Sequence, residues 1–247
     1  SDDRYRLYSY PLNQMFGMQS EIPAFLINMH RISDVSDAEA YVARLNGVKA
    51  LFDQLILNMR DREAAGIIAP KFVFEHVLFD SRNVISGYPF SGKDSSAIFK
   101  DFHGKVQRIK ASSADKNRLL KEAEVALNSS VKPAYDALIA MVEELAETYD
   151  ESDGVWRFKN GLRFYQTALN RTTTTTMTSD QIHELGLKEV ERIHGEMEVI
   201  KNKVGFEGTL QEFFTEMKEN EKFYYPNTAA GKKAYIDEAV RMIDAMK

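Results

Sequence analysis

The stretch that decides the fold is SDAEAYVARLNGVKALFDQLILNMRDREAAG, residues 36–66. Its large apolar side chains recur at steps of four and three residues, which places them on one face of an α-helix. They are Tyr41, Leu45, Val48, Phe52, Leu55 and Met59. Ser36 and Glu39 have the spacing of a capping box, and Gly66 is a residue type that commonly ends a helix. The stretch therefore predicts a long amphipathic helix that begins at Ser36 and packs against another helix.

The same periodicity predicts helices along most of the remaining chain. Pro70 suits the first turn of one of them, and Pro133 predicts a kink in another because proline removes a backbone donor. Thr178 with Gln181, and Thr209 with Glu212, repeat the capping-box spacing. The predicted helices cover residues 70–86, 95–110, 113–149, a short segment around 162–169, 178–204, a segment from 209 and a last one from 229.

Two late helices carry apolar faces of their own. One face is formed by Gly186, Val190, Ile193, Met197, Ile200 and Val204, and the other by Ile236, Val240 and Ile243. The last face still continues at the final residues, so we expect the chain to be the N-terminal part of a larger protein. No strand pattern and no internal repeat is evident. The sequence thus predicts an all-α fold, an elongated bundle or array of long amphipathic helices with short extended connectors.

The predicted organisation is a single helical region over residues 1–247. Residues 1–35 are expected to be looser, with short helical turns and extended pieces around Pro11 and Pro23. A polar break at residues 150–154 gives a possible sub-boundary near 150–155. The five consecutive threonines at 172–176 are expected to be extended, because β-branched side chains lose rotamer freedom in helices.

Composition excludes several classes of protein. Hydrophobic residues make up 44% and charged residues 28%, which is typical of globular proteins rather than disordered ones. The 32 basic and 37 acidic residues are mixed along the chain, so no basic stripe indicates nucleic acid as a partner. No apolar run approaches the ~20 residues of a membrane-spanning helix. The absence of cysteine is compatible with either a reducing cytosol or a bacterial periplasm.

The histidines do not have the spacing of a metal site. His183 and His194 lie eleven residues apart, or ~16 Å along one helix, which is too far for a shared zinc ion. His183 with Glu184 begins a zincin motif, but its second histidine is replaced by Leu187. Glu191 with His194 matches one half of a di-iron motif, and no second copy exists. We therefore predict no metal ligand and no catalytic residue in this chain.

Residues 87–94, GYPFSGKD, resemble a nucleotide-binding loop up to the last position. A P-loop places serine or threonine there to hold magnesium, whereas this chain has Asp94. The alternative is a surface loop in which Asp94 or Ser95 caps the next helix. Nucleotide binding is accordingly the weaker interpretation of this loop.

Three segments in order along the chain carry a family resemblance, and shorter ones support it. They are GLRFYQTALNRTT at 161–173, LGLKEV at 185–190 and GFEGTLQEF at 205–213, with PLNQM at 11–15, YVARL at 41–45 and FYY at 223–225. With these segments the chain resembles the family called domain of unknown function 885. The resemblance extends over most of the chain.

The resemblance implies a longer, mostly helical protein of the bacterial envelope or periplasm, often carrying a lipid anchor in its precursor. Such proteins are similar to zinc metallopeptidases of the carboxypeptidase kind, so zinc is implied for the complete protein. Their zinc-type signature is a helix rich in His and Glu in the C-terminal half, and this chain has no such helix. The resemblance therefore implies that the chain alone is inactive, with the C-terminal catalytic-like domain of the same protein as partner and a peptide as substrate.

The residues that match the family in this region also suggest a substrate groove in the complete protein. They are Phe164, Tyr165, Arg171, Thr172 and Thr173. Aromatic, basic and extended elements suit the side chains, carboxylate and backbone of a peptide. The alternative is that the two aromatic residues pack under the helix from Thr178, while Arg171 caps its own helix. For the chain as a whole, the alternative function is a non-enzymatic helical interaction domain of a bacterial lipoprotein.

Overall fold

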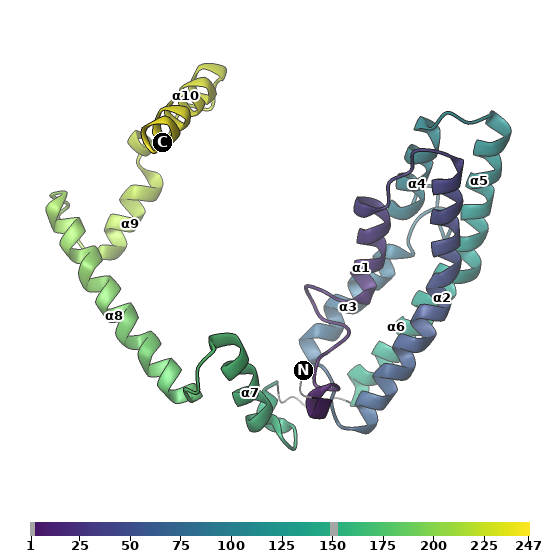
Figure 1. Cartoon of the computed structure of the whole chain (residues 1–247), viewed down its shortest axis with the longest axis horizontal. Coiled ribbons are helices and arrows are strands. Elements are labelled where there is room, and N and C mark those ends of the chain that lie inside the picture. Colours follow the sequence, from purple (N-terminus) through teal and green to yellow (C-terminus); the bar gives the residue numbers. More distant parts are fainter. Residues whose placement is uncertain (1–2, 149–152) are drawn as a thin grey trace. The chain divides into compact units, whose positions relative to one another are not determined.

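The computed structural model describes residues 3–148 and 153–247, which form helices joined by loops without a β-sheet (Figure 1). The predicted all-α class is therefore confirmed. The chain divides into two compact units, Ser1–Tyr165 and Gln166–Lys247, named here the N-terminal and C-terminal units. Most of the predicted polar break at 150–154 lies outside the described residues. The single region with a sub-boundary near 150–155 stays a prediction.

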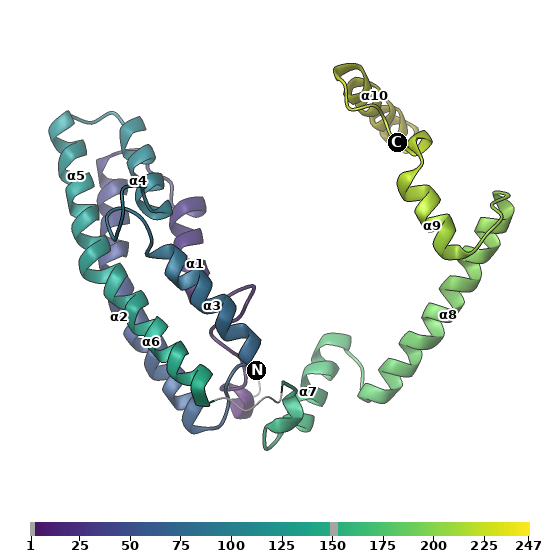
Figure 2. The same ribbon diagram turned by 180° about the vertical axis from the view of Figure 1, so that it is seen from behind.

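The N-terminal unit is a bundle built around one long helix, α2 (Figures 1 and 2). Helix α2 packs against the continuous rod formed by α5, η3 and α6, and α3 packs against α6 and α1. Its elements are η1 (Asp3–Tyr5), α1 (Met18–Ala24), the π-helical turn η2 (Phe25–Met29), α2 (Val35–Ala64), α3 (Lys71–Val84), α4 (Ala97–Arg108), α5 (Ser113–Ala126), the π-helical turn η3 (Leu127–Val131), α6 (Lys132–Thr148) and η4 (Val155–Arg157).

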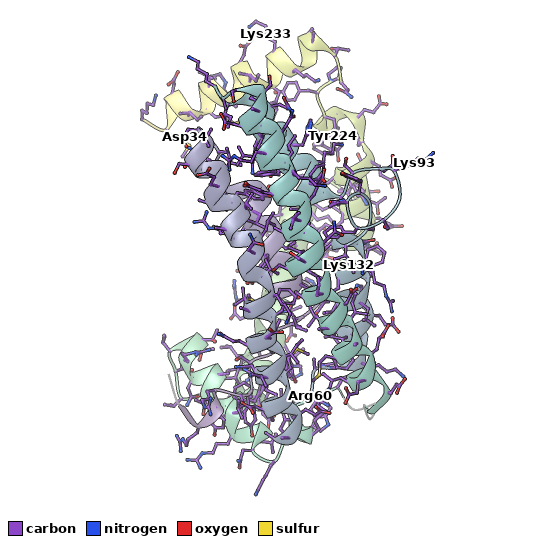
Figure 3. The ribbon with its side chains drawn as sticks, turned by 90° about the vertical axis from the view of Figure 1, so that its right-hand side faces the viewer. Asp34, Arg60, Lys93, Lys132, Tyr224 and Lys233 are labelled. Carbon is purple, nitrogen blue, oxygen red and sulfur yellow. The ribbon has the colours of Figure 1, made fainter. Side chains whose placement is uncertain are left out.

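The N-cap of α2 is Asp34, two residues before the predicted cap at Ser36. The Asp34 carboxylate accepts from the Asp37 amide at 3.0 Å, and the Asp37 carboxylate accepts from the Ser33 amide at 2.9 Å. This reciprocal pair satisfies the free amides, so the predicted capping box of Ser36 and Glu39 is wrong. The helix ends as predicted, with Gly66 in the left-handed region at φ 71°. Figure 3 shows Asp34 and Arg60 toward opposite ends of α2.

The predicted apolar face of α2 forms the centre of the core. All six of its predicted residues are buried, from Tyr41 to Met59. The ring of Tyr41 lies 4.8 Å from that of Phe102 in α4, measured between ring centroids. The ring of Phe52 lies at the same distance from that of Tyr135 in α6. The face therefore joins α2 to helices on two sides.

The kink predicted at Pro133 is a π-helical turn, η3, which lies between α5 and α6. Proline lacks the amide that would continue the hydrogen-bond ladder, and the turn before it changes the register of that ladder. The turn brings buried Ser130 to α2, where its hydroxyl donates to the Asn46 carbonyl at 3.0 Å and accepts from the Lys49 amide at 3.1 Å. Lys132, labelled in Figure 3, marks the start of α6.

The C-terminal unit follows the predicted helix boundaries closely. Its elements are most of α7 (Gly161–Thr173), which crosses the boundary between the units, α8 (Ser179–Lys203), α9 (Leu210–Glu219), η5 (Glu221–Phe223) and α10 (Ala229–Ala245). Both predicted capping boxes are present, at Thr178 and at Thr209. Gly205 ends α8 at φ 73°. Phe206 and Phe213 pack between α8 and α9 with ring centroids 5.1 Å apart.

The apolar faces of α8 and α10 are exposed in this chain. Val190 and Ile200 on α8 are 50% and 55% exposed, and Ile236 and Ile243 on α10 are 59% and 55% exposed. The sequence correctly predicts the helices that carry these faces. Within the described residues, no helix combines the length and the apolar character needed to cross a bilayer.

A buried hydrogen bond gives a direct test of the N-terminal core. The hydroxyl of fully buried Tyr135 donates to the carbonyl of Gln19 at 2.7 Å and so ties α6 to α1. Tyr135→Phe is expected to lower the free energy of unfolding by about 1–2 kcal/mol, because it leaves a buried carbonyl without its donor. Tyr165→Phe is the control, since Tyr165 is 44% exposed. Urea unfolding measures both, and an equal effect of the two changes would contradict this role.

Candidate functional site

Phe164 on α7 belongs to an aromatic cluster in the N-terminal unit. Its ring centroid lies 4.8 Å from that of Tyr8 and 5.4 Å from that of Tyr5. Tyr8 also packs edge-on against Phe158 at 5.6 Å. The alternative prediction placed Phe164 under the helix from Thr178, whereas its ring partners are Tyr5 and Tyr8. Half-buried Phe164 fixes α7 to the first turns of the chain.

Two arginines hold these first turns in place. Arg62 is buried and donates through Nε to the Ser9 carbonyl at 2.9 Å and through Nη2 to the Arg6 carbonyl at 3.4 Å. Burial, followed by the charge of Arg6, lowers the pKa of Arg62. Arg157 donates to the Tyr10 hydroxyl at 3.5 Å and to the Ile68 carbonyl, and it stacks on the Phe158 ring. The adjoining cavity of about 30 Å³ holds little more than one water molecule. The contacts in this region are therefore structural and leave no room for a ligand.

Three of the predicted groove residues remain accessible. Tyr165, Arg171 and Thr172 are exposed on α7. Thr173 is half-buried, and its hydroxyl donates to the Leu169 carbonyl at 2.9 Å, one turn back in the same helix. Of the five predicted residues, Phe164 and Thr173 are therefore engaged in internal contacts, and the other three are free to meet a ligand.

The threonine run is not an extended strand as predicted. Thr172 and Thr173 are helical, and Thr174 has φ 56°, in the left-handed region. The Thr173 hydroxyl bonds to the Leu169 carbonyl one turn back, a contact that threonine commonly makes in helices, and the helix ends at this residue. The Gln166 side chain donates to the Met177 carbonyl at 2.7 Å, which ties the turn after the helix back to α7. Because their backbone is helical, residues 172–173 cannot pair with a peptide substrate as an extended strand would.

Thr174 carries a testable backbone strain. A β-branched residue in the left-handed region costs about 1–2 kcal/mol, because its Cβ crowds the backbone. Thr174→Gly is expected to raise the free energy of unfolding by about 1 kcal/mol. Thr176→Gly has no such strain to relieve and is expected to give no gain. Urea unfolding by circular dichroism compares the two variants, and a loss of stability in Thr174→Gly would contradict the prediction.

The donors present in the described ranges do not fit a zinc centre. Within residues 3–148 and 153–247, no three side chains among His, Cys, Asp and Glu converge to hold a metal ion. His183 and His194 are exposed on α8. Arg192 on the same helix forms ion pairs with Glu189 at 2.8 Å and Glu196 at 2.5 Å. The carboxylates of Glu189 and Glu196 are therefore paired with an arginine of the same helix.

The loop at residues 87–94 has a geometry unlike a phosphate cradle. It follows helix α3, whereas a P-loop follows a strand. The amides of Tyr88, Phe90 and Ser91 all donate to carbonyls within the loop, so these three cannot bind a phosphate. Ser96 caps α4 by accepting from the Phe99 amide, which makes the predicted cap at Asp94 or Ser95 wrong. The loop closes on itself as a structural connection between α3 and α4.

A polar cluster surrounds buried His30 at the end of η2. His30 Nδ1 lies 2.6 Å from Arg44 Nη1, and its Nε2 lies 3.1 Å from the Asp37 carbonyl oxygen. Because arginine can only donate and a carbonyl can only accept, His30 is neutral with its proton on Nε2. Lys105 donates to the Leu26 and Ile27 carbonyls at 2.9 and 2.8 Å and pairs with Asp101 at 2.7 Å. The sequence did not indicate this cluster, since its members come from separate elements.

The His30 cluster predicts a pH dependence of stability. Burial lowers the pKa of His30 below its ordinary value of 6.5, and the charges of Arg44 and Lys105 act in the same direction, against Asp37. The unfolded chain therefore binds the proton more readily than the folded chain does. Neutral His30 therefore contributes to the free energy of unfolding. This contribution is complete above pH 6.5 and is lost as the pH falls from 6.5 through the pKa of His30 in the folded chain.

His30→Gln is expected to weaken this pH dependence, because glutamine has no proton to gain. His76→Gln is the control, since His76 is exposed on α3. Urea unfolding between about pH 7.5 and about pH 5 measures the slope for each protein. Equal slopes in the His30 variant and the wild type would exclude His30 as the source.

The described residues define a class of all-helical proteins with a packed N-terminal bundle and apolar helix faces in the C-terminal unit. The chain belongs to the family of bacterial proteins of unknown function called DUF885, whose family model matches residues 1–247. This confirms the family resemblance. No curated protein matches the chain.

A solved structure shares the fold. It is a crystal structure of a "putative lipoprotein from Colwellia psychrerythraea", which superposes with a TM-score of 0.81 at 23% sequence identity. The match covers 96% of this chain and 40% of the Colwellia chain. The chain therefore spans less than half the length of this relative, and at this identity the likeness concerns the fold alone.

Proposed function

We propose that this chain is the non-catalytic helical scaffold of a zinc metallopeptidase-like protein of the bacterial envelope. The observation that carries the proposal is the exposure of the apolar faces of α8 and α10. The N-terminal unit buries its own core, whereas these two faces leave large aliphatic side chains in water. An apolar helix face of this size is stabilised by packing against another element.

Gly186 lies on the apolar face of α8 and supports a helix as the element that covers this face. An added Cβ at Gly186 would meet no atom within 4 Å. Glycine inside a helix costs about 1 kcal/mol relative to alanine, and this position makes no close approach within the described residues. The glycine therefore allows a neighbouring backbone to come near. The proposed neighbour is the C-terminal catalytic-like domain of the same protein, and the greater length of the Colwellia relative supports it.

Zinc belongs to that further domain in this proposal. A hydrolytic zinc site needs about three protein ligands with one open position, and the described donors of this chain do not fit one. The role of this chain is to supply one wall of the substrate groove. Exposed Arg171 suits the carboxylate of a peptide, and exposed Tyr165 suits its side chains. Phe164 and Thr173 hold α7 in shape through their internal contacts.

An envelope location, with a lipid anchor in the precursor, accompanies this role. The description of the Colwellia relative as a lipoprotein supports it. The finding that none of the described helices could cross a bilayer is compatible with an anchored protein.

The test compares a full-length family member with residues 1–247. The full-length protein is expected to bind about one zinc ion and to cleave peptides in a chelator-sensitive manner, while the shorter chain does neither. Val190→Glu is expected to reduce cleavage and Tm in the full-length protein and to leave the Tm of the shorter chain unchanged. Lys188→Glu, on the same helix, is the charge control. Zinc bound stoichiometrically by residues 1–247 would contradict the proposal.

A second candidate is a non-enzymatic interaction domain. The exposed faces of α8 and α10 favour it equally, because they suit any helical partner. It predicts that the full-length protein neither binds zinc nor cleaves peptides. In that case Val190→Glu would still lower the Tm of the full-length protein.

A further inference from the structure

Helix α8, the longest helix of the C-terminal unit, carries one apolar row whose residues repeat at steps of four and three (Figure 1). The row is named here the α8 seam and consists of Gly186, Val190, Ile193, Met197, Ile200 and Val204. Steps that alternate between four and three residues average 3.5, which is the period of the contact between two helices in a coiled coil. From residue 186 to residue 204 the seam spans ~27 Å of helix. It is therefore long enough to pack along about five turns of another helix.

The α8 seam is only one row wide. The side chains next to it belong to Leu187, Glu189, His194, Glu196, Lys201 and Lys203. Only the first of these is apolar, so polar and charged groups border the seam along most of its length. A narrow stripe of this kind is covered by one helix, whereas a helix inside a larger core presents a broader apolar face.

Helix α10 has the broader kind of face. It carries two adjacent apolar rows, which are Tyr235, Ala239 and Met242, and Ile236, Val240 and Ile243. The two helices of the same unit therefore have different requirements. The face of α10 suits a core built from several elements, and the α8 seam suits a single helix.

One flank of the α8 seam has a net negative charge. Arg192 pairs with Glu189 at 2.8 Å and with Glu196 at 2.5 Å, so one guanidinium serves two carboxylates. The side chains of all three are about half exposed or more. A helix with a lysine or arginine on the facing edge complements this flank, and a helix with an acidic edge is repelled by it.

The same charges disfavour a second copy of α8 as the covering helix. An antiparallel pair would place the two negative flanks against each other. A parallel pair would place Glu196 of one copy opposite Lys201 of the other. That lysine is 7% exposed and already engaged, since it pairs with Glu198 at 2.7 Å and donates to the Gly208 carbonyl at 2.5 Å. Neither arrangement satisfies the flank.

We propose that one helix from a further C-terminal part of the same protein packs along the α8 seam in coiled-coil geometry, with a lysine or arginine beside Glu189 and Glu196. This inference rests on the proposed function, which places a further domain of the same chain on α8. It adds the kind of element that covers the seam. The match covers 40% of the Colwellia chain, so that relative has ample further length for such a helix. A segment of the same chain also meets the seam at a far higher effective concentration than a separate protein does.

Photo-crosslinking in the full-length protein tests the geometry. A photoreactive amino acid is placed at Val190, Ile193 or Met197 of the seam, and at Lys188 on the opposite side of α8 as the control. Each seam position is expected to crosslink within its own chain to one and the same segment beyond residue 247. The attachment points, located by mass spectrometry, are expected to move along that segment in one direction by three or four residues per step. Lys188 is expected to give no crosslink to this segment.

The possible results separate this inference from the proposed function. Attachment points spread over several segments of the same chain would overturn the single helix and leave the scaffold role standing. An adduct with a second copy or with another protein, recognised by its higher mass, would overturn the inference. No crosslink from any seam position would overturn both, because the seam would then be uncovered. An acidic edge on the crosslinked helix would contradict the charge argument.

A pair of glycine variants tests the close contact independently. Gly186→Leu is expected to lower the Tm of the full-length protein by at least about 3 °C, because the leucine side chain holds the two helices apart. Gly195→Leu is the matched control, since Gly195 lies in the same helix outside the seam and also has no atom within 4 Å of an added Cβ. In residues 1–247 neither change is expected to lower Tm, because leucine favours a helix more than glycine does. An equal loss of Tm from both changes in the full-length protein would overturn the proposal.

Discussion

The structure of the N-terminal unit depends on the burial of one face of α2. Its apolar residues contact α4 through Tyr41 and α6 through Phe52, so one helix holds both sides of the bundle together. The π-helical turn before α6 then brings Ser130 onto the backbone of α2. Because a buried polar group needs its partners, this contact fixes the register in which the two long helices meet.

The two units differ in how much of their apolar surface is buried. The residues of the main core cluster all belong to the N-terminal unit, from Leu12 to Leu145. The C-terminal unit has well-capped helices whose apolar faces remain in water. Local signals such as capping boxes are therefore sufficient to define its helices, while the described residues leave their apolar faces uncovered. This contrast is the physical basis for treating α8 and α10 as faces that bind another part of a longer protein.

Much of the fold could be predicted from the sequence, because it depends on local periodicity and capping. The face of α2, the caps at Thr178 and Thr209 and the ends at Gly66 and Gly205 all follow from short-range patterns. The wrong predictions concern two helix caps and the threonine run, where neighbouring side chains offer alternative hydrogen bonds to the same backbone. The observed caps are Asp34 and Ser96. For the predicted substrate groove, the sequence indicated the segment around Phe164 to Thr173 but not which of its side chains are exposed. The His30 cluster depends on contacts between separate elements, which one sequence does not display.

Hydrogen exchange measured by mass spectrometry tests the central claim most directly, by comparing residues 1–247 with a full-length family member. In the shorter chain, the amides of α2 and α6 are expected to exchange only through global unfolding, while those of α8 and α10 exchange through local opening. In the full-length protein, α8 is expected to become strongly protected. Equal protection of α8 in both proteins would contradict the account, because its apolar face would then need no further partner.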